Sequence, residues 1–185
     1  MNKIAYFINS TLLRDFANQL VGTKQPVLDR VVVQISFKPN FFNVFKVIPF
    51  IVFVLEYLTG QKTKFSYSTS DVSYWKLRKK QIVAIHVTLR GQRMFLFIER
   101  FLFTLLPKLS NTLVITFPNS NTFCYFIQNF ILFSELERET ILFNKKNANF
   151  CKFNMAITFV LKNFYPQNVK NGLFFANQIQ FPVKK

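Results

Sequence analysis

Few residues of this chain have the chemistry that catalysis or metal binding requires. His86 is the one histidine, and Cys124 and Cys151 are the two cysteines. A metal site needs several such ligands at a suitable spacing, which these residues do not have. The four glycines also leave little material for a phosphate-binding loop. We therefore predict no enzyme, no metal and no cofactor, and we interpret His86 as a side chain on the face of a sheet.

Three acids that lie close together could suggest acid–base chemistry. Glu135, Glu137 and Glu139 are three of the eight acidic residues. Their close spacing in the sequence argues for simple exposure rather than for catalytic roles. We expect this segment to be a solvated loop.

Basic side chains offer a different chemistry. The segment from Tyr57 to Met94 contains one acid, Asp71, and eight bases, which are Lys62, Lys64, Lys76, Arg78, Lys79, Lys80, Arg90 and Arg93. When such groups meet nucleic-acid phosphates, condensed counterions are released, and this release drives binding. A basic face that is merely solvated stays open as the alternative.

The whole chain carries the same charge bias. It has 185 residues, 24 Lys and Arg against 8 Asp and Glu, a formal net charge of +16 and a pI of about 10.1. This balance argues against an ordinary near-neutral enzyme and favours a polyanionic partner, either nucleic acid or an anionic membrane. Since 50% of the residues are hydrophobic, the chain is no disordered basic tail. Its length predicts a single domain over residues 1–185.

No segment predicts a membrane span. The most apolar stretches are Val47 to Leu55 and Met94 to Leu106. Both are shorter than the roughly 20 residues that cross a bilayer, and the second contains Glu99 and Arg100. The second stretch instead has the wide apolar face of a core helix.

Alternation of apolar and polar residues predicts the strands that position these side chains. Val83, Ile85, Val87 and Leu89 point to one face, while His86, Thr88 and Arg90 point to the other. The expected strands are Arg30 to Phe37, Lys62 to Ser70, Lys76 to Leu89, Thr112 to Phe117, Thr122 to Gln128 and Lys152 to Lys162, with a turn at Pro118 to Asn121.

Helical patterns occupy most of the remaining chain. The expected helices are Tyr6 to Leu20, Phe41 to Leu58, the segment after Gly91 to Leu106, and roughly Pro166 to Gln178. Pro49 either opens the second helix late or kinks it, and Gly60 ends it.

This order of elements predicts an α+β fold, in which helices cover the apolar face of a mostly antiparallel sheet. The other face is then polar and basic, as expected of a surface that meets phosphates and sugar hydroxyls. It carries Gln34, His86, Thr88, Arg90, Lys152, Asn154, Thr158 and Lys162.

Two motifs resemble a known family. One is Leu58-Thr59-Gly60-Gln61-Lys62 after an apolar helix, and the other is Lys76-Leu77-Arg78 followed by Val87-Thr88-Leu89-Arg90-Gly91-Gln92-Arg93-Met94 and Leu106-Pro107. Together they resemble the 5S-rRNA-binding family, the large-subunit ribosomal protein numbered five in the universal scheme. That family carries "TGQKP", then "K(L/I)R" and "VTLRGERM…F…R…LPR". The resemblance is strongest over residues 55–107 and weaker over the rest of the chain.

The resemblance implies a role in the ribosome. Such proteins bind 5S rRNA in the central protuberance of the large subunit, among neighbouring ribosomal proteins. They approach the peptidyl-site tRNA with a loop and contact a protein of the small-subunit head. By matched position, Gln61, Thr88 and Arg90 resemble RNA-contacting residues, and Gln34 stands where the family usually has Asn. With the basic cluster, the candidate RNA-binding set is Gln34, Gln61, Lys62, Lys64, Lys76, Arg78, His86, Thr88, Arg90 and Arg93.

The chain departs from the family at three places. Thr63 replaces the proline of "GQKP", and Ser36 to Pro39 replaces a Gly-rich turn. The loop implied to reach tRNA, Ser66 to Trp75, has one acid and neither a base nor a glycine. We therefore expect weak phosphate attraction there, with any tRNA contact made by hydroxyls and aromatic rings, or lost. The named residues of this tRNA-facing loop are Tyr67, Asp71, Tyr74 and Trp75, and we expect Trp75 to be partly packed. The alternative is that Tyr74 and Trp75 only anchor the loop.

Composition also suggests an origin. The 26 phenylalanines against 4 glycines indicate an AT-rich coding genome. The first fifteen residues lack the Arg-rich, acid-poor character of a transit peptide. We expect a mitochondrial ribosomal protein that is encoded in the mitochondrion, with a plastid or an AT-rich bacterium as alternatives. A basic amphipathic protein on an organellar membrane is the rival function.

Overall fold

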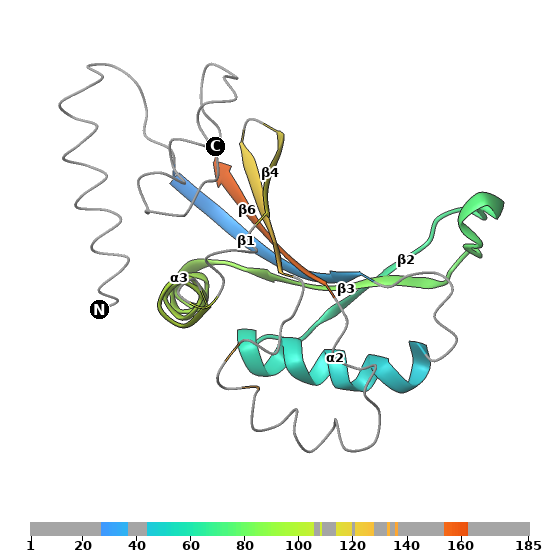
Figure 1. Ribbon diagram of the computed structural model, residues 1–185, viewed down its shortest axis with the longest axis horizontal. Helices are drawn as coiled ribbons and strands as arrows, with labels where there is room; N and C mark the ends of the chain where they lie inside the picture. The colour runs from blue at the N-terminus through green and yellow to red at the C-terminus, as the bar shows by residue number, and fades with distance from the viewer. Residues whose placement is uncertain are drawn as a thin grey trace. The chain divides into compact units, whose positions relative to one another are not determined.

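The computed structural model describes residues 27–36, 44–105, 108, 114–119, 121–127, 133, 136 and 154–162. Within these ranges the elements are β1 (Val27–Ser36), α2 (Val44–Thr59), β2 (Lys64–Tyr67), the 3-10 turn η1 (Ser73–Trp75), β3 (Ile82–Leu89), α3 (Gly91–Arg100), the π-helical turn η2 (Phe101–Leu105), β4 (Val114–Asn119), β5 (Thr122–Ile127) and β6 (Met155–Lys162) (Figure 1). The expected helices at Tyr6 to Leu20 and Pro166 to Gln178 lie outside the described residues.

The described strands form a six-stranded sheet with the order β2-β3-β1-β6-β5-β4. β2 and β3 pair in antiparallel register. The predicted α+β class, with helices against a mostly antiparallel sheet, is confirmed.

Alternating burial along the strands shows why this sheet forms. In β1, Val31, Val33 and Ile35 are fully buried, whereas Gln34 between them is partly exposed. β6 repeats the pattern over eight residues, with Met155, Ile157, Phe159 and Leu161 buried. Successive side chains of a strand point to opposite faces, so one face of each strand joins the core. Burial of such apolar area, at about 25 cal/mol per Å², is the main favourable term in folding.

The chain divides into two compact units. The first comprises residues 1–31, 90–125 and 158–185, and the second comprises residues 32–89 and 126–157. The prediction of a single domain stays a prediction.

In the second unit, α2 packs against β3 (Figure 1). Phe50, Ile51, Val54, Leu55 and Leu58 form the buried side of α2. Pro49 lies inside the helix, in its second turn. As predicted, Gly60 ends the helix: its φ of +63° is in the left-handed region, and its N–H donates to the carbonyl of Glu56 at 2.8 Å.

An aromatic cluster forms the core of the first unit. Phe101 of η2 lies 5.7 Å from Tyr125 and 6.3 Å from Phe159, measured between ring centroids. Phe123 of β5 stacks on Phe159 of β6 at 4.7 Å. Burial raises the pKa of the Tyr125 phenol, so this ring stays neutral in the core. The cluster attaches the helical segment that includes α3 to β5 and β6.

Several boundaries differ from the sequence prediction: β1 begins at Val27 rather than at Arg30, and β2 spans Lys64–Tyr67 rather than Lys62 to Ser70. β3 begins at Ile82 rather than at Lys76, for a reason given below. β4 runs through Pro118 and Asn119, so the predicted turn there is shorter. Leu136 is buried, so the segment expected to be a solvated loop contributes to the core at this position. The three glutamates of that segment lie outside the described residues.

Within the described part of the chain, no helix is both long enough and apolar enough to cross a membrane.

Two adjacent residues of β3 test the assignment of the faces. Val87 is buried and Thr88 is exposed. We predict that Val87→Asp lowers the free energy of unfolding by more than about 3 kcal/mol, because it buries an unpaired charge. The control Thr88→Asp should cost about 1 kcal/mol or less, the range of strand propensity effects. Urea denaturation followed by circular dichroism measures both values. Equal losses in the two variants would contradict the assignment.

Candidate nucleic-acid interface

The polar face of the β2–β3 hairpin is built by its register. Lys64 pairs with His86, and Ser66 pairs with Ala84, so these side chains share one face. The Ser66 hydroxyl lies 3.0 Å from Nδ1 of His86. His86 is partly exposed, and it is a sheet-face side chain as the sequence predicts. Together with the exposed Thr88, the hairpin presents an ammonium group, hydroxyls and an imidazole. These groups suit phosphates and sugar hydroxyls.

The turn that precedes β2 presents two further candidates, Gln61 and Lys62. Thr59, at the end of α2, is buried, and its hydroxyl donates to the Leu55 carbonyl at 2.6 Å. The same oxygen accepts the N–H of Gln61 at 3.4 Å. Gln61 is partly exposed and Lys62 is exposed, so both side chains are available at the surface.

Beyond β2 and β3 the hairpin continues as an ordered loop over residues 68–81, which we call the distal loop. Ser68 and Gln81 are the first and last residues of this loop, and the Ser68 N–H donates to the Gln81 carbonyl at 2.9 Å. Farther out, Val72 and Leu77 exchange two backbone hydrogen bonds of 3.0 and 3.1 Å. η1 closes the end of the loop (Figure 1).

Two lysines in left-handed conformation explain why β3 begins late. Lys76 has φ of +53° and Lys80 has φ of +65°. L-residues avoid this region, and a strand cannot pass through it. The segment between them therefore turns, and the N–H of Gln81 donates back to the Arg78 carbonyl at 3.1 Å.

This boundary changes the charge of the loop. Lys76, Arg78, Lys79 and Lys80 are all exposed and belong to the distal loop rather than to a strand. Asp71, the acid of the loop, accepts the Lys79 N–H at 2.5 Å through Oδ1. The expectation of weak phosphate attraction assumed that the bases lie outside the loop, and that assumption is wrong.

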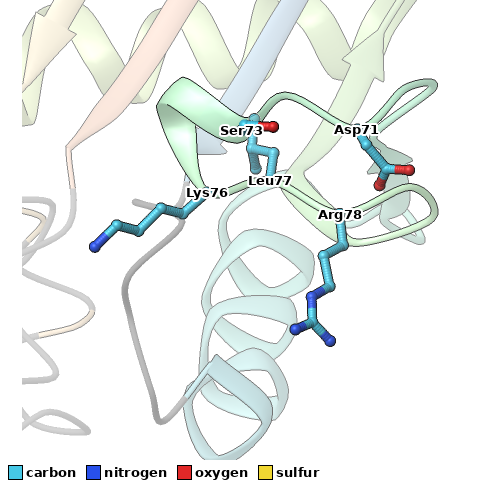
Figure 2. Close-up of a pocket in the computed structure, with 5 residues that line it drawn as sticks. All are labelled: Asp71, Ser73, Lys76, Leu77 and Arg78. Carbon is cyan, nitrogen blue, oxygen red and sulfur yellow. The ribbon is translucent and has the colours of Figure 1, made fainter.

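Figure 2 shows the shallow hollow beside these residues. Its volume is about 600 Å³, and it is lined by Asp71, Ser73, Lys76, Leu77 and Arg78. The side chains of Lys76 and Arg78 extend in different directions and do not converge on one point. Such an arrangement can contact separate phosphates along a nucleic-acid strand, but it does not enclose a single anion.

Aromatic rings are exposed in the same loop. Tyr74 is 90% exposed and Trp75 is 59% exposed, so both rings are accessible, and the packing expected of Trp75 stays a prediction. Tyr67, at the end of β2, is also exposed. Unpaired bases stack on such rings, and a groove of cations with exposed aromatics is typical of single-stranded nucleic-acid binding.

Known proteins resemble this chain. No protein-family model matches it. It is 27% identical over 123 residues to large ribosomal subunit protein uL5m of Reclinomonas americana, covering 65% of this chain and 67% of that protein. It is 29% identical over 119 residues to uL5 of Syntrophus aciditrophicus, covering 63% and 66%, and 41% identical over 63 residues to uL5 of Flavobacterium johnsoniae, covering 34% of each.

The chain is thus similar to proteins named large ribosomal subunit protein uL5, among them the mitochondrial uL5m. The matches cover between about a third and two thirds of these relatives' own length. The resemblance seen in the two motifs is thereby confirmed.

The remaining residues implied by the uL5 resemblance lie at separate places. Gln34 of β1 is partly exposed, and its Nε2 donates to the Ser36 hydroxyl at 3.1 Å. Arg90 precedes α3 as its N-cap residue, and Arg93 lies in the first turn; both are exposed. These two arginines belong to the first unit, whereas the hairpin and the distal loop belong to the second.

On the part of the polar face formed by β6, Thr158 is partly exposed, and its hydroxyl lies 3.2 Å from Sγ of the buried Cys124. Asn154 and Lys162 are exposed there, and Lys152 lies outside the described residues.

Lys79 and Lys80 were counted in the basic cluster of the sequence and were expected to lie in a strand, but they were left out of the candidate RNA-binding set. Glu56 was also missed, because nothing in the spacing indicates its contacts. Its Oε1 accepts the Thr63 N–H at 3.1 Å and the Thr63 hydroxyl at 3.4 Å.

Adjacent lysines of the distal loop give a test of its backbone. We predict that Lys80→Gly leaves the free energy of unfolding unchanged or raises it by up to about 1 kcal/mol, since glycine adopts positive φ without strain. Lys79→Gly removes the same charge, but Lys79 is not among the residues with positive φ. It should lower the free energy of unfolding by up to about 1 kcal/mol. Thermal or urea denaturation measures both, and equal effects would contradict the backbone geometry.

Proposed function

We propose that this chain is a structural, non-catalytic component of the large ribosomal subunit and that it binds ribosomal RNA. The observation that carries the proposal is its similarity to uL5 proteins, whose names assign them to the large ribosomal subunit. The net charge of +16 and the exposed bases of the distal loop support a polyanionic partner.

The finer proposal concerns location. The chain binds 5S rRNA, or equivalent large-subunit rRNA, in the central protuberance, next to the small-subunit head and the peptidyl-site tRNA. The family motifs around Gly60 and from Val87 to Met94 support this location. The four bases and three exposed aromatics at the hairpin end support the distal loop as the tRNA-contacting or rRNA-contacting segment, since they combine phosphate attraction with stacking surfaces.

We also propose that the ribosome in question is mitochondrial and that the gene lies in the mitochondrial genome. The relative named uL5m supports the compartment. The abundance of phenylalanine and the scarcity of glycine support an AT-rich organellar genome.

The first experiment measures how salt changes RNA binding. With about five phosphates contacted, the logarithm of the binding constant should fall with the logarithm of salt at a slope of roughly −3.5 to −4.5. Filter binding of the full chain to a 5S rRNA transcript between low and moderate salt provides the slope. A slope near zero would contradict an RNA scaffold and favour the rival membrane function, which binding to anionic vesicles then tests.

The second experiment compares two variants at the uL5-like motif. Arg90→Ala should lower RNA affinity by about 1.5–3 kcal/mol, because it removes a charge-assisted hydrogen bond, and Thr88→Ala should cost about 0.5–1.5 kcal/mol. Both residues are exposed, so the thermal midpoint should hardly change. Arg100→Ala removes the same charge from the last turn of α3 and serves as the control. Equal loss of RNA affinity in Arg90→Ala and Arg100→Ala would point to non-specific charge rather than to this site.

A further inference from the structure

The turn between α2 and β2 is fastened by one acidic residue. Glu56 contacts this turn twice: its carbonyl accepts the Gly60 N–H at 2.8 Å, and its carboxylate accepts two donors of Thr63. The first contact lies at the beginning of the turn and the second at its end. Gln61 and Lys62, two candidate RNA-binding residues, lie between these contacts.

The carboxylate of Glu56 is directed at Thr63 and not at the neighbouring ammonium groups. Lys62 and Lys64 flank Thr63 and are both exposed. The structure describes all three charged residues, and it records no ion pair between Glu56 and either lysine. The two lysines thus keep their charges available to a polyanion while the acid beside them holds the backbone.

An acid at this place otherwise has a cost for RNA binding. A carboxylate near phosphates repels them, because salt at about 0.1 M screens charges only beyond a Debye length of about 10 Å. The contacts of this carboxylate can offset that repulsion if they keep the turn ordered before RNA binds. Gly60 adopts φ of +63° in this turn, and a glycine has access to more backbone conformations than any other residue. Ordering the turn only on binding would reduce affinity through the entropy of the ordered residues.

Thr63 has the donors that this fastening requires. Its N–H makes the shorter bond and its hydroxyl the longer one. The family motif given above has proline at this position, and proline has no N–H to donate. In this chain, two hydrogen bonds to the Glu56 carboxylate hold this position.

We propose that Glu56 is a positioning residue for RNA binding: its contacts with Gly60 and Thr63 fix the turn that presents Gln61 and Lys62. This inference rests on the proposed RNA-binding function, and it predicts an effect opposite in sign to simple electrostatics. Removing a negative charge from a basic surface should tighten RNA binding, whereas losing the contacts with Thr63 should weaken it.

The experiment uses the full chain and a 5S rRNA transcript at fixed salt. Glu56→Ala should weaken RNA binding by roughly threefold to tenfold, since the turn must then be ordered on binding. Glu56→Gln keeps an oxygen acceptor without the charge, so it should bind as tightly as the unmodified chain or more tightly. Glu99→Ala removes one negative charge from α3 and is the matched control, which should not lose affinity. Affinity in Glu56→Ala equal to or above that of the unmodified chain would overturn the proposal.

A second measurement separates this inference from the proposed function. Hydrogen exchange of the Thr63 amide without RNA should accelerate in Glu56→Ala but not in Glu99→Ala. If no form of the chain binds RNA, the proposed function fails, while the exchange rates still report whether Glu56 holds the turn. Unchanged exchange at Thr63 would overturn the fastening itself.

If Glu56→Ala does not fold, Thr63→Ala gives the same test from the other partner. It removes the 3.4 Å hydroxyl bond and keeps the N–H bond, so its loss of affinity should be smaller. Where both single variants fold, the effect of Thr63→Ala should largely disappear in the Glu56→Ala background, because the two residues share one interaction. Full additivity of the two losses would contradict the pairing.

Discussion

The burial of one face of each strand is the constraint on which the rest of the structure depends. Val31, Val33 and Ile35 in β1, and Ile85, Val87 and Leu89 in β3, are buried on one side of their strands. A slip of one residue would turn every one of these side chains to the solvent, so the register is strongly specified. The same register places Lys64, His86 and Thr88 on the opposite face. The polar surface therefore follows from the core without any separate interaction to define it.

In each unit, a helical segment packs against buried residues of the strands. α2 packs against β3, and the segment after α3 attaches through Phe101 to Tyr125 and Phe159. Aromatic pairs with these centroid separations add stabilisation beyond the area they bury. Rigid elements beneath a binding surface matter for a scaffold protein, because its side chains must be held in place before the partner arrives.

In the distal loop, two basic residues also have a strained backbone conformation. Lys76 and Lys80 adopt positive φ, a conformation that costs an L-residue about 1–2 kcal/mol. Glycine would adopt it freely, but it would bring no charge. Strained backbone tends to occur where function requires a particular side chain, and the exposed bases here fit that tendency. The carboxylates nearby, Asp71 and Glu56, accept backbone N–H groups rather than opposing the bases in ion pairs.

The sequence by itself determined the features that depend on local periodicity. Alternation within Lys76 to Leu89 and within Lys152 to Lys162 predicted two strands, which the structure shows as Ile82–Leu89 and Met155–Lys162, and Gly60 marked the end of α2. The motif around Arg90 carried the resemblance to the 5S-rRNA-binding ribosomal protein family. The tertiary structure alone decided where β3 begins, and therefore that Lys76, Arg78, Lys79 and Lys80 belong to a loop. It also revealed the contact between Glu56 and Thr63. These features depend on the sign of φ and on hydrogen bonds formed when the chain folds back on itself, and a pattern of apolar residues encodes only which face of an element is buried.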